Sequence, residues 1–168
     1  MHDLYHWTHL DAVAHDHLLQ IKRPWLNQVF FFIRIILYFF IWSWISKTFF
    51  KKSVLQDETG DHQLTLDLER SASYSMILFA LTLTFSAVDL VMSITPHWYS
   101  TIFGVYIFAG AVLIAFSVTS LMYMYLRRKN LLKDIVTVEH YHDLGKLIYG
   151  FNIFWSYIAF CQFFLIWY

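Results

Sequence analysis

The sequence contains a single cysteine, Cys161, and few charged residues. One cysteine excludes an internal disulfide and an iron–sulfur cluster held by this chain's own cysteines, and the chain has no C-x-x-C-H motif for covalent haem. Charged residues make up 14% of the chain, whereas a soluble domain has about 25%. The formal net charge is zero, so nothing in the composition predicts binding to nucleic acid.

The N-terminal residues lack the pattern of a secretory signal, which needs a basic start and a short apolar stretch. They read "MHDLYHWTHLDAVAHDH" and are polar and rich in histidine. His2, His6 and His9 fall on one face of a helix, so a metal site is possible in principle. We prefer a solvated or partner-contacting arm over residues 1–23, with no metal.

Apolar residues dominate the rest of the chain: 58% of all residues are hydrophobic and 21% are aromatic. Trp and Tyr gather near the ends of the apolar runs, as at membrane interfaces. A helix needs about 20 residues to cross about 30 Å of hydrocarbon. The sequence therefore predicts an all-α membrane protein, in which residues 24–168 form an up-down bundle of four transmembrane helices at about 24–50, 73–95, 100–126 and 147–168.

The distribution of lysine and arginine predicts the orientation in the membrane. Residues 22 and 23 are the only basic residues on one side, and Arg34 lies inside the first apolar segment. The nine on the other side are Lys47, Lys51, Lys52, Arg70, Arg127, Arg128, Lys129, Lys133 and Lys146. Because basic loops stay in the cytoplasm, the two long loops should be cytoplasmic. The arm and the hairpin at 95–99 should be periplasmic, in a multi-pass protein of the bacterial inner membrane.

Four polar side chains are predicted to lie at one depth, one from each segment: Arg34, Asp89, Tyr106 and Gln162. At 1.5 Å per helical residue they lie roughly 10 Å below the outer surface. A lone charge costs about 2.5–3.5 kcal/mol at the centre of a membrane helix, so such groups find partners. We expect Arg34 to pair with Asp89, assisted by Tyr106 and Gln162. Alternatively, Arg34 extends to the surface and Asp89 bonds to its neighbours.

His97 follows Pro96 in the short connection "TPHWY", where we expect Pro96 to end the second helix. Histidine titrates near neutrality, so Asp89 and His97 could pass a proton to the outer water. They could equally bond to the two oxygens of a quinol head group. In the purely structural alternative, His97 caps a tight turn, and Trp98 and Tyr99 belong to an ordinary aromatic belt.

Further polar residues continue toward the predicted cytoplasmic side. Candidates for the place where protons would enter are Glu139, His140, His142 and Asp143. Hydroxyl groups on segments two to four could form a proton wire, but such groups often bond only to their own helix backbone. No histidine lies deep in a segment, which argues against a b-type haem.

Small residues are frequent in the third segment, where they let helices approach closely in lipid. We expect them to serve packing: Gly104, Ala109, Gly110, Ala111 and Ala115.

Three stretches resemble a known family: "YHWTHLDAV", "VDLVMSITPHWYSTIFGVYIFAG" and "HDLGKLIYGFNIFWSYIAFCQFFLIWY". They are similar to membrane subunits of alternative complex III, which belong to the polysulfide-reductase membrane-subunit (NrfD-like) family. The likeness covers essentially the whole chain and is greatest to the subunit type called ActF. It implies that the complete protein has two four-helix bundles, so that this chain is a partial one.

The resemblance also implies a role in electron transport. In that family one sister subunit offers a quinol pocket built with Asp and His, whereas the ActF-like sister gives scaffold and a proton path. Asp89 and His97 match the hairpin motif, and His142 and Asp143 match the cytoplasmic segment. The implied partners are a sister NrfD-like membrane subunit, an iron–sulfur subunit and multihaem cytochrome c subunits, together with membrane lipid.

We therefore expect an integral subunit of a quinol:cytochrome c (or similar acceptor) oxidoreductase that gives scaffold and a proton path, with no redox centre of its own. Haem and iron–sulfur clusters would lie in the partners, and quinone is the cofactor that could touch this chain. Alternatives are a quinol-oxidising pocket at Asp89 and His97, a pure assembly scaffold, and half of an ion or solute transporter. A transporter half would show broken helices and inverted repeats, and the apolar segments have no internal proline or repeat.

Overall fold

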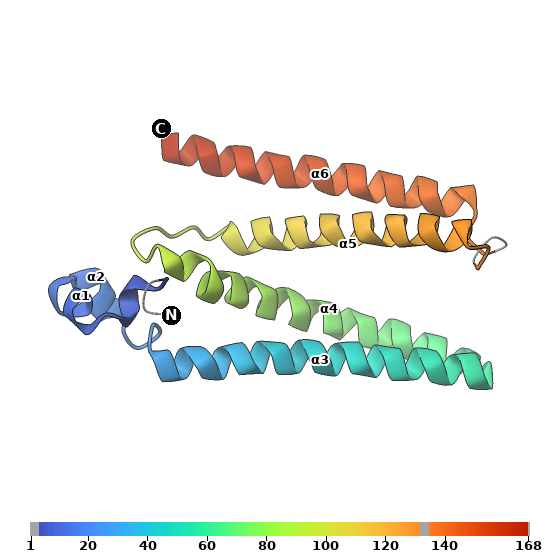
Figure 1. The fold of residues 1–168 in the computed structure, drawn as a ribbon, viewed down its shortest axis with the longest axis horizontal. Coiled ribbons are helices and arrows are strands. Elements are labelled where there is room, and N and C mark those ends of the chain that lie inside the picture. Colours follow the sequence, from blue (N-terminus) through green and yellow to red (C-terminus); the bar gives the residue numbers. More distant parts are fainter. Residues whose placement is uncertain (1–3, 132–134, 168) are drawn as a thin grey trace. The chain divides into compact units, whose positions relative to one another are not determined.

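The computed structural model describes residues 4–131 and 135–167, without the side chains of residues 10–12. The described part of the chain is helical and contains no strand (Figure 1). Its elements are η1 (His6–Thr8), α1 (Leu10–His15), α2 (His17–Lys22), α3 (Gln28–Thr59), α4 (His62–Leu90), η2 (Met92–Ile94), α5 (Phe103–Arg128) and α6 (Val138–Trp167).

The four long helices, α3 to α6, are each long and apolar enough to cross a membrane. The predicted all-α class with four candidate spans is therefore confirmed, and the chain is a multi-pass membrane protein. It divides into two compact units, residues 1–101 and 102–168. In the first unit the N-terminal elements precede a hairpin of α3 and α4, and the second unit is a hairpin of α5 and α6.

The helices extend beyond the predicted apolar segments. The polar connection after residue 50 is mostly helical, because α3 continues to Thr59 and α4 begins at His62. Gly60 reverses the chain with φ 66°, a left-handed conformation that glycine adopts at little cost. Helix α4 itself ends at Leu90, and η2 continues the second candidate span to Ile94, two residues before Pro96. The helices differ from the predicted segments because the criterion of membrane length follows apolar residues, whereas a helix ends at caps and turns.

The buried face of helix α3 contains a charged residue, and its exposed face is lined with apolar side chains. Its buried residues are Phe31, Arg34 and Tyr38. Exposed residues recur at helical spacing along another face, at Val29, Ile33, Ile36 and Phe40. A helix with apolar residues outside and a charge inside is suited to lipid, in which a charged group needs a protein partner.

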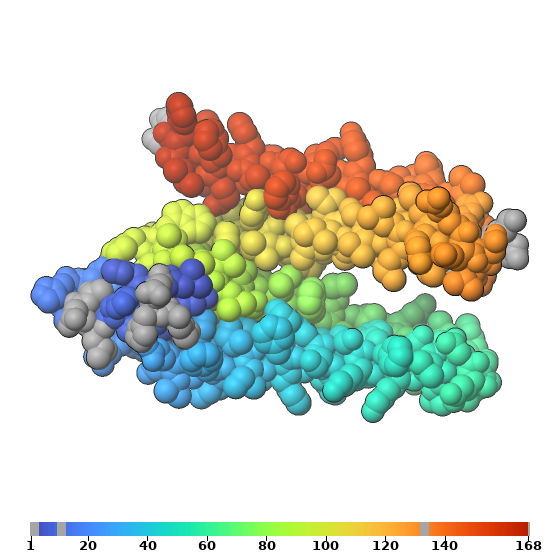
Figure 2. Space-filling view, in the orientation of Figure 1, coloured from blue at the N-terminus to red at the C-terminus, as the bar shows by residue number. Residues whose placement is uncertain are grey.

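The N-terminal residues fold onto the start of α3 instead of extending into solvent. Tyr5, Trp7 and Leu19 are buried together with Phe31. The rings of Tyr5 and Trp7 lie 5.4 Å and 5.3 Å from the ring of Phe31, measured between centroids. Figure 2 shows the N-terminal segment against the first turns of α3. The expectation of a solvated arm is corrected for Tyr5, Trp7 and Leu19, because these apolar side chains are buried, whereas contact of the arm with a partner stays a prediction.

Small residues on α5 allow it to approach α6 closely, as expected. Gly104 and Ala109 are buried. A β-carbon added to Gly110 would lie 3.1 Å from Nε1 of Trp155 on α6. The ring of Trp155 also stacks on Tyr106, with 5.3 Å between the ring centroids. Tyr106 and Gly110 thus form one turn of α5 against which Trp155 packs.

Candidate functional site

Asp89 is the most completely buried polar residue among those described, with 0% of its surface exposed. It lies at the end of α4, one residue before the helix stops. The predicted pairing with Arg34 is confirmed: Nε and Nη2 of Arg34 donate to Oδ2 and Oδ1 of Asp89, at 2.7 Å and 2.9 Å. This two-point geometry is the strong form of an arginine–carboxylate pair.

Two further donors complete the coordination of the Asp89 carboxylate. Trp25 Nε1 donates to Oδ1 at 2.9 Å, and the Tyr38 hydroxyl donates to Oδ2 at 2.8 Å. Each oxygen therefore accepts two hydrogen bonds, and a carboxylate offers about four such positions. A proton arriving at either oxygen would have to displace one of these donors. We call Trp25, Arg34, Tyr38 and Asp89 the Asp89 cluster.

Aromatic rings and a backbone carbonyl enclose the guanidinium of Arg34. Its central carbon lies 4.3 Å from the ring centroids of both Trp25 and Phe30. Its remaining terminal nitrogen, Nη1, donates to the backbone oxygen of Trp25 at 3.1 Å. Arg34 is only 5% exposed, so the alternative in which it reaches the membrane surface is wrong. The cluster ties the segment before α3 to both helices of the hairpin.

Tyr106 and Gln162 belong to the second unit, so their predicted assistance to Asp89 stays a prediction. Within the first unit, Trp25 and Tyr38 donate to Asp89 the kind of hydrogen bond that was expected from Tyr106 and Gln162. Tyr38 could have been found, because it follows Arg34 by four residues and shares its helical face. Trp25 could not, because it lies in the turn before α3, where no periodicity applies.

His97 contacts the N-terminal segment. Its Nε2 lies 2.9 Å from Oδ2 of Asp16, and its side chain is 60% exposed. Oδ1 of the same Asp16 accepts the backbone N–H groups of Leu18 and Leu19 and caps α2. Lys22 Nζ donates to the backbone oxygen of Pro96. The short turn after α4 is thus attached to α2, and the contacts of Asp89 among the described residues do not include His97.

The backbone at the end of α4 is fixed by two more side chains. Ser93 Oγ donates to the backbone oxygen of Asp89 at 2.5 Å, and the Tyr5 hydroxyl donates to that of Leu90 at 3.0 Å. Burial raises the pKa of the Tyr5 phenol above its ordinary value of 10.0, and the charge of Asp89 raises it further. Tyr5 therefore keeps its proton, and its role as a donor, throughout the neutral range.

A small hollow lies beside the Asp89 cluster. Its volume is about 150 Å³, and its wall includes Trp25, Val88, Met92, Trp98 and Tyr99. A cavity of about this volume can take a benzene-sized ring. The alternative of a quinol pocket predicted such a space, and Asp89 also lines it, but the four hydrogen bonds to its carboxylate leave no free acceptor position.

Four hydroxyl groups of the proposed proton wire bond to the backbone of their own helices. Thr82, Thr84, Ser117 and Thr119 each donate to the backbone oxygen four residues earlier. Thr82 also accepts a hydrogen bond from Trp42 Nε1 at 3.0 Å. These contacts match the structural alternative, and conduction along the series stays a prediction.

The candidates for proton uptake lie on the first turns of α6. Glu139, His140, His142 and Asp143 are all exposed. Nδ1 of His140 accepts the backbone N–H of Thr137 at 3.2 Å, and Asp143 pairs with Lys146 at 3.3 Å. Their described contacts are local to the start of α6, and their functional role is untested.

The described histidine, cysteine and acidic side chains form no group of three suited to hold a metal ion. His6 and His9 lie with ring centroids 6.0 Å apart, and His2 lies outside the described residues. No protein-family model matches this chain, and no curated protein does.

Proposed function

We propose that this chain is an integral subunit of a quinol:cytochrome c (or similar acceptor) oxidoreductase in the bacterial inner membrane, and that it serves mainly as scaffold. Two observations support the proposal: the four apolar helices and the resemblance of three stretches to membrane subunits of alternative complex III. The single cysteine is consistent with a chain that holds no iron–sulfur cluster of its own. Electrons would pass through partners, namely the iron–sulfur and multihaem cytochrome c subunits beside a sister NrfD-like subunit.

The carboxylate of Asp89, whose hydrogen-bond positions are all occupied, is the observation that favours the scaffold role. With 0% exposure and four donors from three side chains, it favours a fixed structural centre over a proton relay. Removing one partner of a buried ion pair costs about 3–5 kcal/mol, because the other charge is left uncompensated. The cluster would hold the outer end of the first unit in the form that partners recognise.

A first experiment tests the assignment to an oxidoreductase. The tagged chain is purified from native membranes in mild detergent, and co-purifying haem is measured by its absorbance. Stoichiometric c-type haem in a stable complex is the expected result. A chain that purifies without any haem-containing partner would refute the assignment and leave the transporter alternative.

A second experiment tests scaffold against proton path by replacing Asp89 with Asn in the intact complex. We expect less assembled complex, with quinol-dependent cytochrome c reduction and proton release per assembled complex within about twofold of the native rates, a change of about 0.4 kcal/mol. Asp57→Asn is the control, since Asp57 is an exposed carboxylate on α3. Full assembly with lost turnover or lost proton release would instead place Asp89 in the coupling path.

The hollow beside the cluster favours quinol binding as a second candidate function. It would hold a ring against Trp25, Trp98 and Tyr99. A bulky residue at Met92, as in Met92→Trp, would fill it, and because Asp89 also lines the hollow, assembly of the complex is measured beside the KM. Unchanged quinol KM in that variant would exclude this candidate, and a raised KM with normal assembly would favour it.

A further inference from the structure

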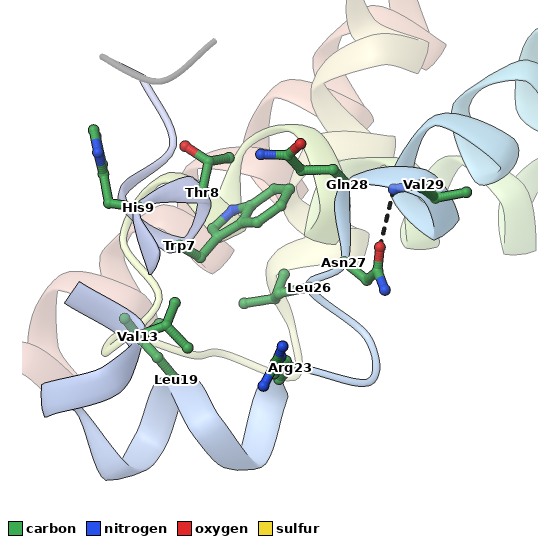
Figure 3. A pocket seen from close by; sticks show the side chains of 10 residues that line it. All are labelled: Trp7, Thr8, His9, Val13, Leu19, Arg23, Leu26, Asn27, Gln28 and Val29. Atoms are coloured by element: carbon green, nitrogen blue, oxygen red, sulfur yellow. Dashed lines mark hydrogen bonds between the residues drawn. The ribbon is translucent and has the colours of Figure 1, made fainter. Parts of the chain in front are cut away.

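A second, larger hollow lies between the N-terminal segment and the start of α3. Its volume is about 570 Å³, within the range of pockets that bind small molecules. Figure 3 shows the side chains that line it, with Trp7 and Thr8 at one end and Arg23 at the other. All belong to the first unit, and the Asp89 cluster does not contribute to the wall.

The wall carries an unsatisfied hydrogen-bond donor. Trp7 is 4% exposed, and its indole Nε1 is buried with no hydrogen-bond partner. Leaving such a group unpaired costs about 1–3 kcal/mol. A ligand in the hollow would reach this closed-off N–H only after the Trp7 ring turns, and an acceptor oxygen placed there would then remove the penalty.

The remaining polar groups of the wall favour an anion. Arg23 is exposed, and the amide of Gln28 stands at the first position of α3 (Figure 3). The N-terminus of this 32-residue helix carries a partial positive charge that attracts anions. Among the residues whose side chains the structure describes, none of those that line the hollow is acidic: Trp7, Thr8, His9, Val13, Leu19, Arg23, Leu26, Asn27, Gln28 and Val29.

The position of the hollow suits an anion that is attached to acyl chains. Val29 lines it and is itself 69% exposed. Val29 is also the first residue of the exposed apolar face of α3, which continues through Ile33, Ile36 and Phe40. A head group in the hollow would therefore have its chains along a helix face that suits lipid.

We propose that this hollow binds the phosphate of an anionic phospholipid, with the glycerol end beside Val29. Arg23, the α3 N-terminus and the Trp7 N–H supply the positive charge and the donors. The site does not depend on the proposed redox role. A free phosphate shares the head-group chemistry but would make no use of the exposed apolar face.

The test uses the full chain in detergent. Native mass spectrometry measures retention of phosphatidylglycerol and phosphatidylethanolamine, and thermal unfolding is followed with each lipid and with glycerol 3-phosphate. We expect phosphatidylglycerol to be retained preferentially and to raise the midpoint temperature, with no effect of glycerol 3-phosphate. Equal retention of both lipids would overturn the proposal, as would equal stabilisation by glycerol 3-phosphate, which would indicate a soluble anion.

Two variants and their matched controls locate the site. Arg23→Gln should weaken phosphatidylglycerol binding about tenfold, since a charge-assisted bond is lost. Arg128→Gln, which removes an exposed arginine from the end of α5, should leave it unchanged. Trp7→Phe keeps the ring but removes the N–H and should weaken binding about fivefold, whereas Trp44→Phe at an exposed site on α3 should not. Native affinity in Arg23→Gln, or equal losses in variants and controls, would refute the assignment.

Discussion

At the scale of single residues, the Asp89 cluster shows how a membrane helix keeps a charge. Its stability depends on the number of donors, because each carboxylate oxygen accepts two hydrogen bonds. Water cannot replace a lost donor at a fully buried position without opening the structure. The aromatic partners are therefore as much part of the ion pair as the arginine.

Tyr38→Phe tests this dependence with the smallest change. It removes the hydroxyl that bonds to Oδ2 of Asp89 and keeps the ring in place. We expect a loss of about 1.5–3 kcal/mol in the free energy of unfolding, the usual value of a hydrogen bond to a charged group. Titration of the full chain with SDS in mixed micelles measures it. Tyr74→Phe, at an exposed tyrosine on α4, is the control, and equal effects of the two changes would contradict the prediction.

The sequence predicted the pair but neither of the two aromatic donors beside it, Trp25 and Tyr38. Arg34 and Asp89 were identifiable because both are charges at one depth on adjacent antiparallel helices. Trp25 was not identifiable, since in the sequence it resembles any tryptophan at a membrane interface. Only the fold of the turn before α3 directs its N–H to Asp89. Nor was the Asp16–His97 contact, because it joins two loops whose approach depends on tertiary packing.

At the scale of elements, each hairpin depends on one glycine for a different reason. Gly60 has φ 66° between α3 and α4, with nothing within 4 Å of where a β-carbon would lie. Gly110 has ordinary helical backbone, but a β-carbon there would press on Trp155. The first is a conformational requirement and the second a requirement of packing.

Gly60→Ala should destabilise the hairpin of α3 and α4 by about 1–2 kcal/mol, the cost of a left-handed conformation for an L-residue. Gly60→Asn should cost less, because asparagine tolerates this conformation. Gly145→Ala is the control, since Gly145 lies in α6 with open space around its β-position. SDS titration measures all three, and a cost for Gly60→Asn as large as for Gly60→Ala would argue against the conformational explanation.

Gly110→Ala should be less stable than Gly150→Ala by about 1–2 kcal/mol. Both changes gain helix propensity, but the new methyl group at Gly110 lies 3.1 Å from Trp155 Nε1, whereas that at Gly150 meets nothing within 4 Å. Overpacking of this kind typically costs about 1–3 kcal/mol. The near-ultraviolet circular dichroism of the variants reports whether the tryptophan has moved. Equal stability of the two variants would mean that Trp155 shifts without cost.

Helix ends and the folded N-terminal segment were the elements that apolar periodicity could not predict. The ends depend on Asn27, Gly60 and Asp61, whose roles are set by backbone geometry. The N-terminal segment packs through Tyr5, Trp7 and Leu19, which alternate with polar residues without a helical or strand period. Composition gave the class of protein correctly because length and apolar content alone decide it.

At the scale of the whole molecule, the remaining question is which ends of the helices face the cytoplasm. Nine lysines and arginines lie toward one end of the predicted apolar segments and two lie toward the other end, which predicts the orientation by the positive-inside rule. The turn that holds Tyr99 and the N-terminal segment share one side, since Lys22 and Asp16 contact Pro96 and His97. Gly60 lies at the opposite end of α3 and α4.

Cysteine labelling of intact cells checks this orientation. With Cys161 replaced by Ser, single cysteines are placed at Tyr99 and at Glu58, both exposed positions. A maleimide that cannot cross the inner membrane should label Tyr99→Cys in cells whose outer membrane is permeable, and Glu58→Cys only after the inner membrane is opened. The Cys161→Ser chain without a new cysteine gives the background. Labelling of Glu58→Cys alone in intact cells would invert the orientation, and the Asp89 cluster would then lie toward the cytoplasm. The rule rests on charge alone, so that outcome would mean that the charges in the loops of this chain do not determine how it inserts.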